Sequence, residues 1–304
     1  MTDVCVKMLL DDGTTRVTGV VLTQTVAEAR RRHQASAMAT VALGRGMVAA
    51  TLLSSTVRET GSINLQLVAN GPLGAMVVDA KGKGTVRAYL RRPTVEFPTA
   101  TSQRISVAQA LGRDGFINVI MDPAGGEFSR GTCALVSSEV DEDVGEYLEK
   151  SAQVHSAIGT DVLLTSDTRE VMVAAGLLVQ SLPGSDGRLV DQAQERLKHG
   201  GMYHVLGGQA PADVMSLAKR LFPEEHLTVL EERRIVWQCT CSRERVLAAV
   251  SMLGRQEVAN ILVEDGRVDA RCDFCMASYQ LSQSDLTALL AEMDAYALGG
   301  PEVA

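Results

Sequence analysis

The sequence contains no uninterrupted apolar run of about eighteen residues, the length from which a membrane span is inferred. Its longest apolar stretch, VMVAAGLLVQSL at 171–182, is too short, so we expect no membrane partner. The N-terminal residues MTDVCVKMLLDDGTT show no basic stretch followed by an apolar segment, so no export signal is expected. We therefore expect a cytoplasmic protein, in a reducing compartment where closely spaced cysteines more often bind metal or exchange electrons than form permanent disulfides.

Recognisable catalytic arrangements are also missing. There is no Ser-His-Asp order and no prominent pair of carboxylates, and the KGKG segment at 81–84 lacks the spacing of a phosphate-binding loop, which makes a hairpin turn the better prediction. The GRG segment at 44–46 lies in a helix rich in small residues and predicts a close packing contact. The histidines show no ligand spacing with one another or with the cysteines; they are His33, His155, His199, His204 and His226. We therefore do not expect an enzyme.

The net charge and the length of the chain indicate which partners and how many domains to expect. The chain has a formal net charge of −8, which argues against a protein built to coat nucleic acid, so no nucleic-acid partner is expected. With 304 residues, of which 46% are hydrophobic, the chain is long enough for two or three domains with a substantial core.

The first 180 residues predict one mixed α+β domain. A turn at DDGTT separates two strands within residues 1–22, and the following segment, 25–57, predicts helices that pack closely on a sheet. From residue 61, apolar residues recur at every second position, which predicts several short strands up to about residue 181. One amphipathic helix, VDEDVGEYLEKSAQV, interrupts them, with its acidic residues in the first turn.

Two further segments follow. LPGSDG at 182–187 predicts a boundary, and residues 181–231 hold two short helical patterns that we interpret as a helical linker without a core of its own. Residues 232–304 form a third segment, too small for a thick hydrophobic core and therefore expected to need a disulfide or a metal. The predicted fold class is thus α+β, with a core domain over 1–180, a linker over 181–231 and a small C-terminal zinc-binding domain over 232–304.

This third segment contains two close cysteine pairs, Cys239-x-Cys241 and Cys272-x-x-Cys275. A structural zinc ion takes four ligands in a tetrahedron, and two short cysteine spacings can each supply one edge of it. Between the pairs the sequence predicts two helices, each ending in glycine, and then a strand. The pattern predicts a four-thiolate site for one Zn²⁺ per chain.

Other interpretations of the cysteine pairs remain open. The site could be a purely structural zinc knuckle, a zinc-ribbon module that binds nucleic acid or regulates, or a thiol–disulfide oxidoreductase, although CDFC does not open a helix after a strand as in thioredoxin-like enzymes. The site could also be a redox switch. Oxidation of metal-bound thiolates removes ligands, and metal binding energy in so small a domain is folding energy.

The whole chain resembles the heat shock protein 33 family of redox-regulated chaperones. The motifs that carry this resemblance are CTCSRER and EDGRVDARCDFC with the aromatic SYQLS, together with EARRRHQASAMATVALGRGMVAATLL, GSINLQLVANGPLG, EYLEKSAQ, AAGLLVQSLPG and PEEHLTVLE. The resemblance implies an inactive, zinc-bound reduced form, and an oxidised form with disulfides Cys239–Cys241 and Cys272–Cys275. It also implies zinc release, unfolding of the linker, dimerisation, and ATP-independent holding of unfolded or oxidatively damaged client proteins.

Two further cysteines, Cys5 and Cys133, lie outside this pattern. Both fall in predicted strands of the core domain. Free cysteine behaves as a small hydrophobic residue, so we expect each to be buried and without a redox role.

Overall fold

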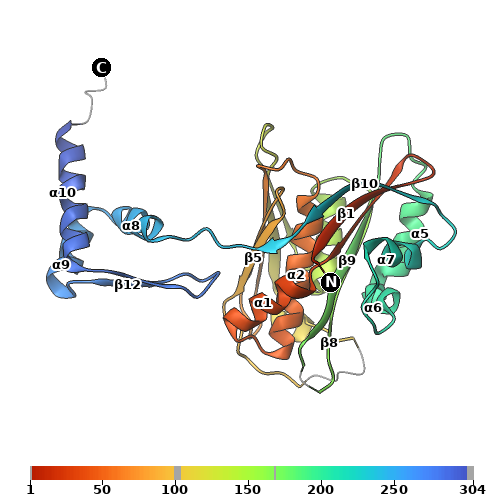
Figure 1. The fold of residues 1–304 in the computed structure, drawn as a ribbon, viewed down its shortest axis with the longest axis horizontal. Coiled ribbons are helices and arrows are strands. Elements are labelled where there is room, and N and C mark those ends of the chain that lie inside the picture. Colours follow the sequence, from red (N-terminus) through yellow and green to blue (C-terminus); the bar gives the residue numbers. More distant parts are fainter. Residues whose placement is uncertain (1, 99–103, 168, 300–304) are drawn as a thin grey trace. The chain divides into compact units, whose positions relative to one another are not determined.

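The computed structural model describes residues 2–98, 104–167 and 169–299. Contacts divide the chain into two compact units, Met1–Gln238 and Cys239–Ala304, here the first and second unit. Both units combine sheets and helices, which confirms the predicted α+β class (Figure 1). The segment 181–231 is grouped with the first unit, and the division falls immediately before the first paired cysteine.

One sheet of the first unit, sheet A, has five strands in the order β10-β1-β2-β9-β8, all antiparallel to their neighbours. The turn between β1 and β2 forms because the Asp12 carboxylate accepts hydrogen bonds from the N–H groups of Thr14 and Thr15, at 3.0 and 2.9 Å. Gly13 in this turn has a φ of 66°, the left-handed region that favours glycine. The strands are β1 Val4–Leu10, β2 Thr15–Val21, β8 Ser156–Leu164, β9 Val171–Ser181 and β10 Leu227–Arg234.

The second sheet, sheet B, has six strands in the order β11-β5-β4-β3-β6-β7. Burial alternates along β3, β4 and β5, as the period of two in their sequences predicted. The KGKG segment forms the β4–β5 turn, as predicted. The strands are β3 Ser62–Ala69, β4 Met76–Lys81, β5 Thr85–Leu90, β6 Gly115–Asp122, β7 Ser129–Ala134 and β11 Val236–Trp237, with the short helix α3 Ala108–Leu111 before β6.

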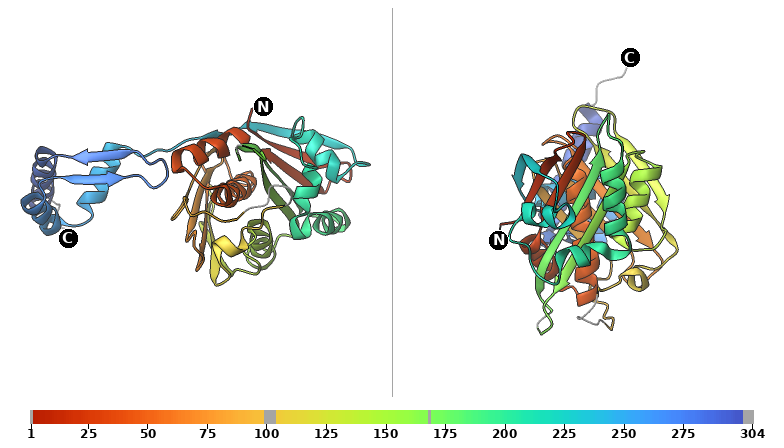
Figure 2. Two further views of the ribbon diagram at one scale, coloured as in Figure 1. Left: turned by 90° about the horizontal axis from the view of Figure 1, so that it is seen from below. Right: turned by 90° about the vertical axis from the view of Figure 1, so that its right-hand side faces the viewer.

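The predicted helical segment forms two helices, α1 (Thr23–His33) and α2 (Ala37–Ser54). Every residue of α2 is buried, and the helix contacts strands of both sheets, between which it runs (Figure 2). By length and composition α2 could cross a membrane, but it is wholly enclosed by protein. Its apolar character is therefore explained by packing on two sides, which leaves no polar face.

The GRG segment lies in α2 and combines packing with buried charge. A Cβ atom on Gly44 would lie 2.6 Å from Val162, so the predicted close contact is confirmed. Arg45 beside it is fully buried and donates hydrogen bonds to Glu139 and Asp161, at 2.7 and 2.8 Å. The sequence analysis missed this cluster because its carboxylates lie 94 and 116 residues from Arg45 along the chain.

The helices of residues 181–231 pack on sheet A. Their apolar residues share one hydrophobic core with the strands of that sheet, so the segment has no separate core, as the sequence predicted. Unfolding of this segment on oxidation, which the family resemblance implies, remains a prediction. The helices are α5 Arg188–Leu197, the 3₁₀ turn η1 Lys198–Gly200, α6 Gly201–Leu206 and α7 Val214–Leu221; the predicted amphipathic helix, α4 (Val140–Lys150), precedes β8.

The second unit consists of helices around a two-stranded hairpin. Two helices are followed by Gly254 and Gly266, as predicted, while the C-terminal helix α10 was not foreseen. The buried hydrophobic cluster of this unit is small, with Val250, Val258, Leu281, Leu286 and Leu289 at its centre. The elements are α8 Arg243–Ser251, α9 Arg255–Glu264, β12 Val268–Arg271, β13 Ser278–Leu281 and α10 Gln283–Gly299.

Candidate metal centre

The first cysteine pair lies in the short segment between β11 and α8. Ser242 ends this segment as the N-cap of α8, where its hydroxyl accepts a hydrogen bond from the N–H of Arg245 at 3.4 Å. The guanidinium of Arg245 reaches back and donates to the Thr240 hydroxyl at 2.7 Å. The helix start thus braces the residue that separates Cys239 from Cys241.

The second pair lies in the loop between β12 and β13. The N–H of Met276 donates to the carbonyl of Cys272 at 2.8 Å, and the N–H of Cys272 donates to the carbonyl of Ala277 at 2.9 Å. Met276 has a φ of 61°, a left-handed conformation that is uncommon outside glycine. The chain turns tightly here, which brings both sulfur atoms of the pair to one side of the hairpin end.

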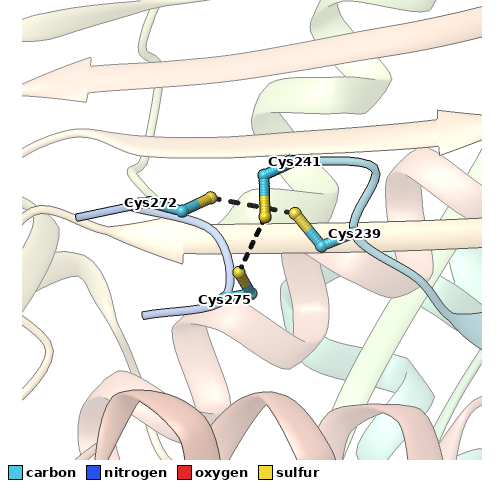
Figure 3. A group of neighbouring side chains, drawn as sticks. All are labelled: Cys239, Cys241, Cys272 and Cys275. Carbon is cyan, nitrogen blue, oxygen red and sulfur yellow. Dashed lines mark hydrogen bonds between the residues drawn. The ribbon is translucent and has the colours of Figure 1, made fainter. Parts of the chain in front are cut away.

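The structure brings the four predicted cysteines together (Figure 3). Their sulfur atoms all lie within 4.8 Å of one another. The Sγ atoms of Cys239 and Cys272 are 3.8 Å apart, and those of Cys241 and Cys275 are 3.2 Å apart. A tetrahedral zinc site with Zn–S bonds of about 2.3 Å has sulfur–sulfur edges of about 3.8 Å, so these donors fit one four-coordinate metal ion.

Two thiols of this cluster have raised pKa values, which favours their protonated form. Burial, reinforced by the neighbouring thiols, raises the pKa of Cys275 to about 12. Burial also raises the pKa of Cys272. Four thiolates so close together would repel one another, so a divalent cation that binds here must displace the protons and compensate the charge.

Tyr279 on β13 contacts the cluster directly. Its hydroxyl donates a hydrogen bond to the Sγ of Cys241 at 3.0 Å. This hydrogen bond raises the pKa of Tyr279 to about 12. A donor to a ligating sulfur orients the ligand and offsets part of its charge. The sequence analysis gave Tyr279 no role, because contact between residues 38 positions apart depends on the hairpin.

The second unit carries more negative than positive charge. From residue 239 onward the sequence has five arginines and no lysine, against ten carboxylates. Arg243 pairs with Asp285, and Arg255 pairs with Asp294. A surface of this composition repels a phosphate backbone, which disfavours the zinc-ribbon interpretation as a nucleic-acid module.

The remaining candidate ligands lie elsewhere. All five histidines belong to the first unit. Cys5 is buried as predicted, and burial raises the pKa of its thiol to about 12. Cys133 is half-buried rather than buried, because β7 is the outer strand of sheet B, and its Sγ lies 3.1 Å from the Ser151 hydroxyl. Neither cysteine joins the metal cluster.

Comparisons with known proteins agree along nearly the whole chain. The family model described as Hsp33 protein matches residues 3–282. A 33 kDa chaperonin of Synechococcus sp. is 38% identical over 299 residues, which cover 96% of this chain and 91% of that protein. A 33 kDa chaperonin of Levilactobacillus brevis is 35% identical over 298 residues, which cover 97% of this chain and 100% of that protein.

The fold is shared as well. The crystal structure of a 33 kDa chaperonin from Thermotoga maritima, a heat shock protein 33 homologue, matches with a TM-score of 0.83 at 29% identity and covers 97% of this chain. These comparisons place the chain in a class of chaperones, and its four clustered thiols could bind a metal ion. The chain belongs to the heat shock protein 33 family.

Proposed function

We propose that this protein is an ATP-independent, redox-regulated chaperone that holds unfolding and oxidatively damaged proteins and prevents their aggregation. The observation that carries the proposal is the four-thiol cluster in a unit with so small a hydrophobic core. Such a unit depends on its metal to fold, and its metal depends on reduced cysteines. Membership of a chaperone family supplies the activity that this dependence would control.

In the reduced state, Cys239, Cys241, Cys272 and Cys275 hold one Zn²⁺ per chain as thiolates. Bound zinc supplies cross-linking energy to the second unit, by analogy with zinc-finger peptides in which binding contributes about 10–16 kcal/mol. Tyr279 donates to the Cys241 sulfur and steadies the first pair. Reduced protein is inactive in this account.

Oxidation removes the ligands. For each disulfide, two thiolates give up two electrons to one peroxide molecule, which takes up two protons and leaves as two water molecules. We propose the pairs Cys239–Cys241 and Cys272–Cys275, as the family resemblance implies. Loss of the thiolate donors releases the cation, and the second unit then loses its main source of folding energy.

The linker 181–231 is the element that unfolds after the second unit has lost its metal. Its helices cover an apolar face of sheet A, so their release would uncover a surface suited to unfolded polypeptides. The residues of the sheet buried in this shared core include Met8, Leu10, Val17, Leu177 and Val179. In the proposed active state the linker is unfolded, the protein is a homodimer in the cytoplasm, and neither nucleic acid nor a membrane takes part.

The switch is tested by following zinc and disulfides together. Peroxide at mild heat is expected to release one zinc ion per chain while the two disulfides form, as measured with a colorimetric zinc chelator and by mass spectrometry of non-reduced peptides. The sulfur contacts Cys239–Cys272 and Cys241–Cys275 cross between the pairs, so the peptide map also decides the pairing. Retention of zinc after complete thiol oxidation would refute the proposed switch.

A further inference from the structure

The strap 227–238 consists of β10, β11 and the residues that join them to Cys239. Its strand β10 forms one edge of sheet A, and β11 forms one edge of sheet B. β10 pairs with β1 along its length, from Leu10↔Leu227 to Val4↔Arg234 (Figure 1). The register shifts between Lys7 and Met8, which leaves Leu230 without a partner in a bulge. The outer side of β10 is thus an edge protected by a bulge and by the charges of EERR, the usual defences against unwanted strand pairing.

Few apolar contacts hold β10 in place. Leu227 is its one buried residue, while Val229 and Leu230 are 49% and 56% exposed. The ion pair between Lys7 and Glu231, at 2.6 Å, is partly solvated and therefore weak. Backbone hydrogen bonds with little buried apolar area characterise a segment of low local stability. β10 can therefore separate from the sheet more readily than the strands beneath it.

The strand beneath, β1, has fewer of these defences. β1 reads VCVKMLL, with Lys7 as its one charge, and four of its seven residues are buried. If β10 leaves, β1 becomes the edge of sheet A with unpaired backbone groups beside apolar side chains. A long, largely apolar edge with a single charge can recruit another extended chain.

The opposite edge of sheet A is closed in a different way. On β8 the N–H of Thr160 donates to the Asp141 carboxylate at 3.4 Å, and the N–H of Val162 donates to the Asp161 carboxylate at 2.8 Å. Both carboxylates are buried, and Asp161 is fixed by Arg45. Side chains anchored in the core therefore occupy the β8 edge, whereas a weakly attached strand occupies the β1 edge.

The strap leads directly into the metal cluster. After β10, the N–H of Ile235 donates to the Asp3 carbonyl at 2.9 Å, and the N–H of Val236 donates to the Gly84 carbonyl at 3.0 Å. The N–H of Gln238 donates to the Val86 carbonyl at 3.2 Å, and the next residue is Cys239. Unfolding around the cysteines therefore begins one residue from the last hydrogen bond of the strap.

We propose that β1 is a client-docking edge: when the strap detaches, β1 accepts an extended segment of an unfolded polypeptide as a new strand in the place of β10. This inference rests on the proposed redox function and names the surface and the binding mode. β10 shows that the edge accepts an extended antiparallel strand. A second copy fits less well, because symmetric antiparallel pairing of two β1 strands, Val4–Leu10, would set Lys7 opposite Lys7.

Hydrogen exchange of the β1 amides tests the proposal on the full-length protein. Oxidation is expected to deprotect those amides of residues 4–10 that face β10, and addition of reduced, carboxymethylated α-lactalbumin, a permanently unfolded polypeptide, is expected to protect them again. Zinc release is measured on the same sample. If zinc is lost while the β1 amides stay protected, or if they become protected at higher protein concentration without the unfolded polypeptide, the docking proposal is wrong although the redox switch stands.

A charge on the edge supplies a second test. Leu9 is half-buried on β1 opposite Thr228, and Leu9→Lys should leave zinc release unchanged while weakening binding of the unfolded polypeptide by the oxidised protein about tenfold. Val77→Lys is the matched control, because Val77 is a half-buried apolar residue on β4 of sheet B. Equal binding by the two variants would overturn the assignment of β1 as the docking edge.

Discussion

Replacing Cys272 with serine is expected to unfold the second unit and to release the linker 181–231 and the strap, while the central strands of both sheets stay folded. The serine hydroxyl is a poor zinc ligand, and three remaining thiolates no longer close the tetrahedron. The unit then loses binding energy of about 10–16 kcal/mol, the scale seen in zinc-finger peptides. Its small hydrophobic cluster around Val258 and Leu281 does not offset such a loss.

Limited proteolysis with zinc analysis measures this outcome. We expect cleavage in 181–238 and in 239–299 at low protease concentration, protection of the central strands of both sheets, and no stoichiometric zinc. Cys133→Ser is the matched control, since Cys133 lies outside the metal cluster, and it should retain both zinc and protection. A Cys272→Ser protein that kept chelator-resistant zinc would contradict the four-thiolate site.

Replacing Arg45 with methionine is expected to destabilise the first unit by about 3–5 kcal/mol, the cost of leaving buried charges without their partner. Arg45 is fully buried and is the direct ion-pair partner of Glu139 and Asp161, whose side chains are 8% and 1% exposed. Methionine fills much of the volume but compensates neither carboxylate. The loss is large against a typical domain stability of about 5–15 kcal/mol.

Urea unfolding of the reduced protein, followed by circular dichroism, gives the free energy for this comparison. Arg31→Ala is the control, because the Arg31 side chain is 68% exposed and its pair with Glu28 is solvated. That variant should leave the stability nearly unchanged, because exposed ion pairs contribute little. An Arg45→Met protein as stable as Arg31→Ala would show that the buried cluster contributes no net stability.

Local patterns predicted much of this structure. The alternation of apolar and polar residues predicted β3, β4 and β5, because alternate residues of these strands face the core and the solvent. The density of small residues predicted the tightly packed helix α2. The cysteine spacings predicted the cluster since each pair carries its own geometry within one turn. These features depend on neighbouring residues, which a single sequence displays.

Features that depend on distant pairing were missed. β10 contains EERR and was not recognised as a strand, because its partner β1 lies more than two hundred residues away in the chain. In the sequence, Arg45 is part of a helix rich in small residues. Only the fold places the carboxylates of Glu139 and Asp161 beside it. The contact of Tyr279 with Cys241 likewise requires the folded hairpin.

The central claim is that oxidation of the cysteine cluster turns on chaperone activity. Light scattering from a thermally unfolding client protein tests it, with this protein added either reduced and zinc-loaded or oxidised with peroxide at mild heat, and without ATP. The account predicts that the oxidised form suppresses aggregation and the reduced form does not. Equal suppression by both forms, or none by either, would contradict it.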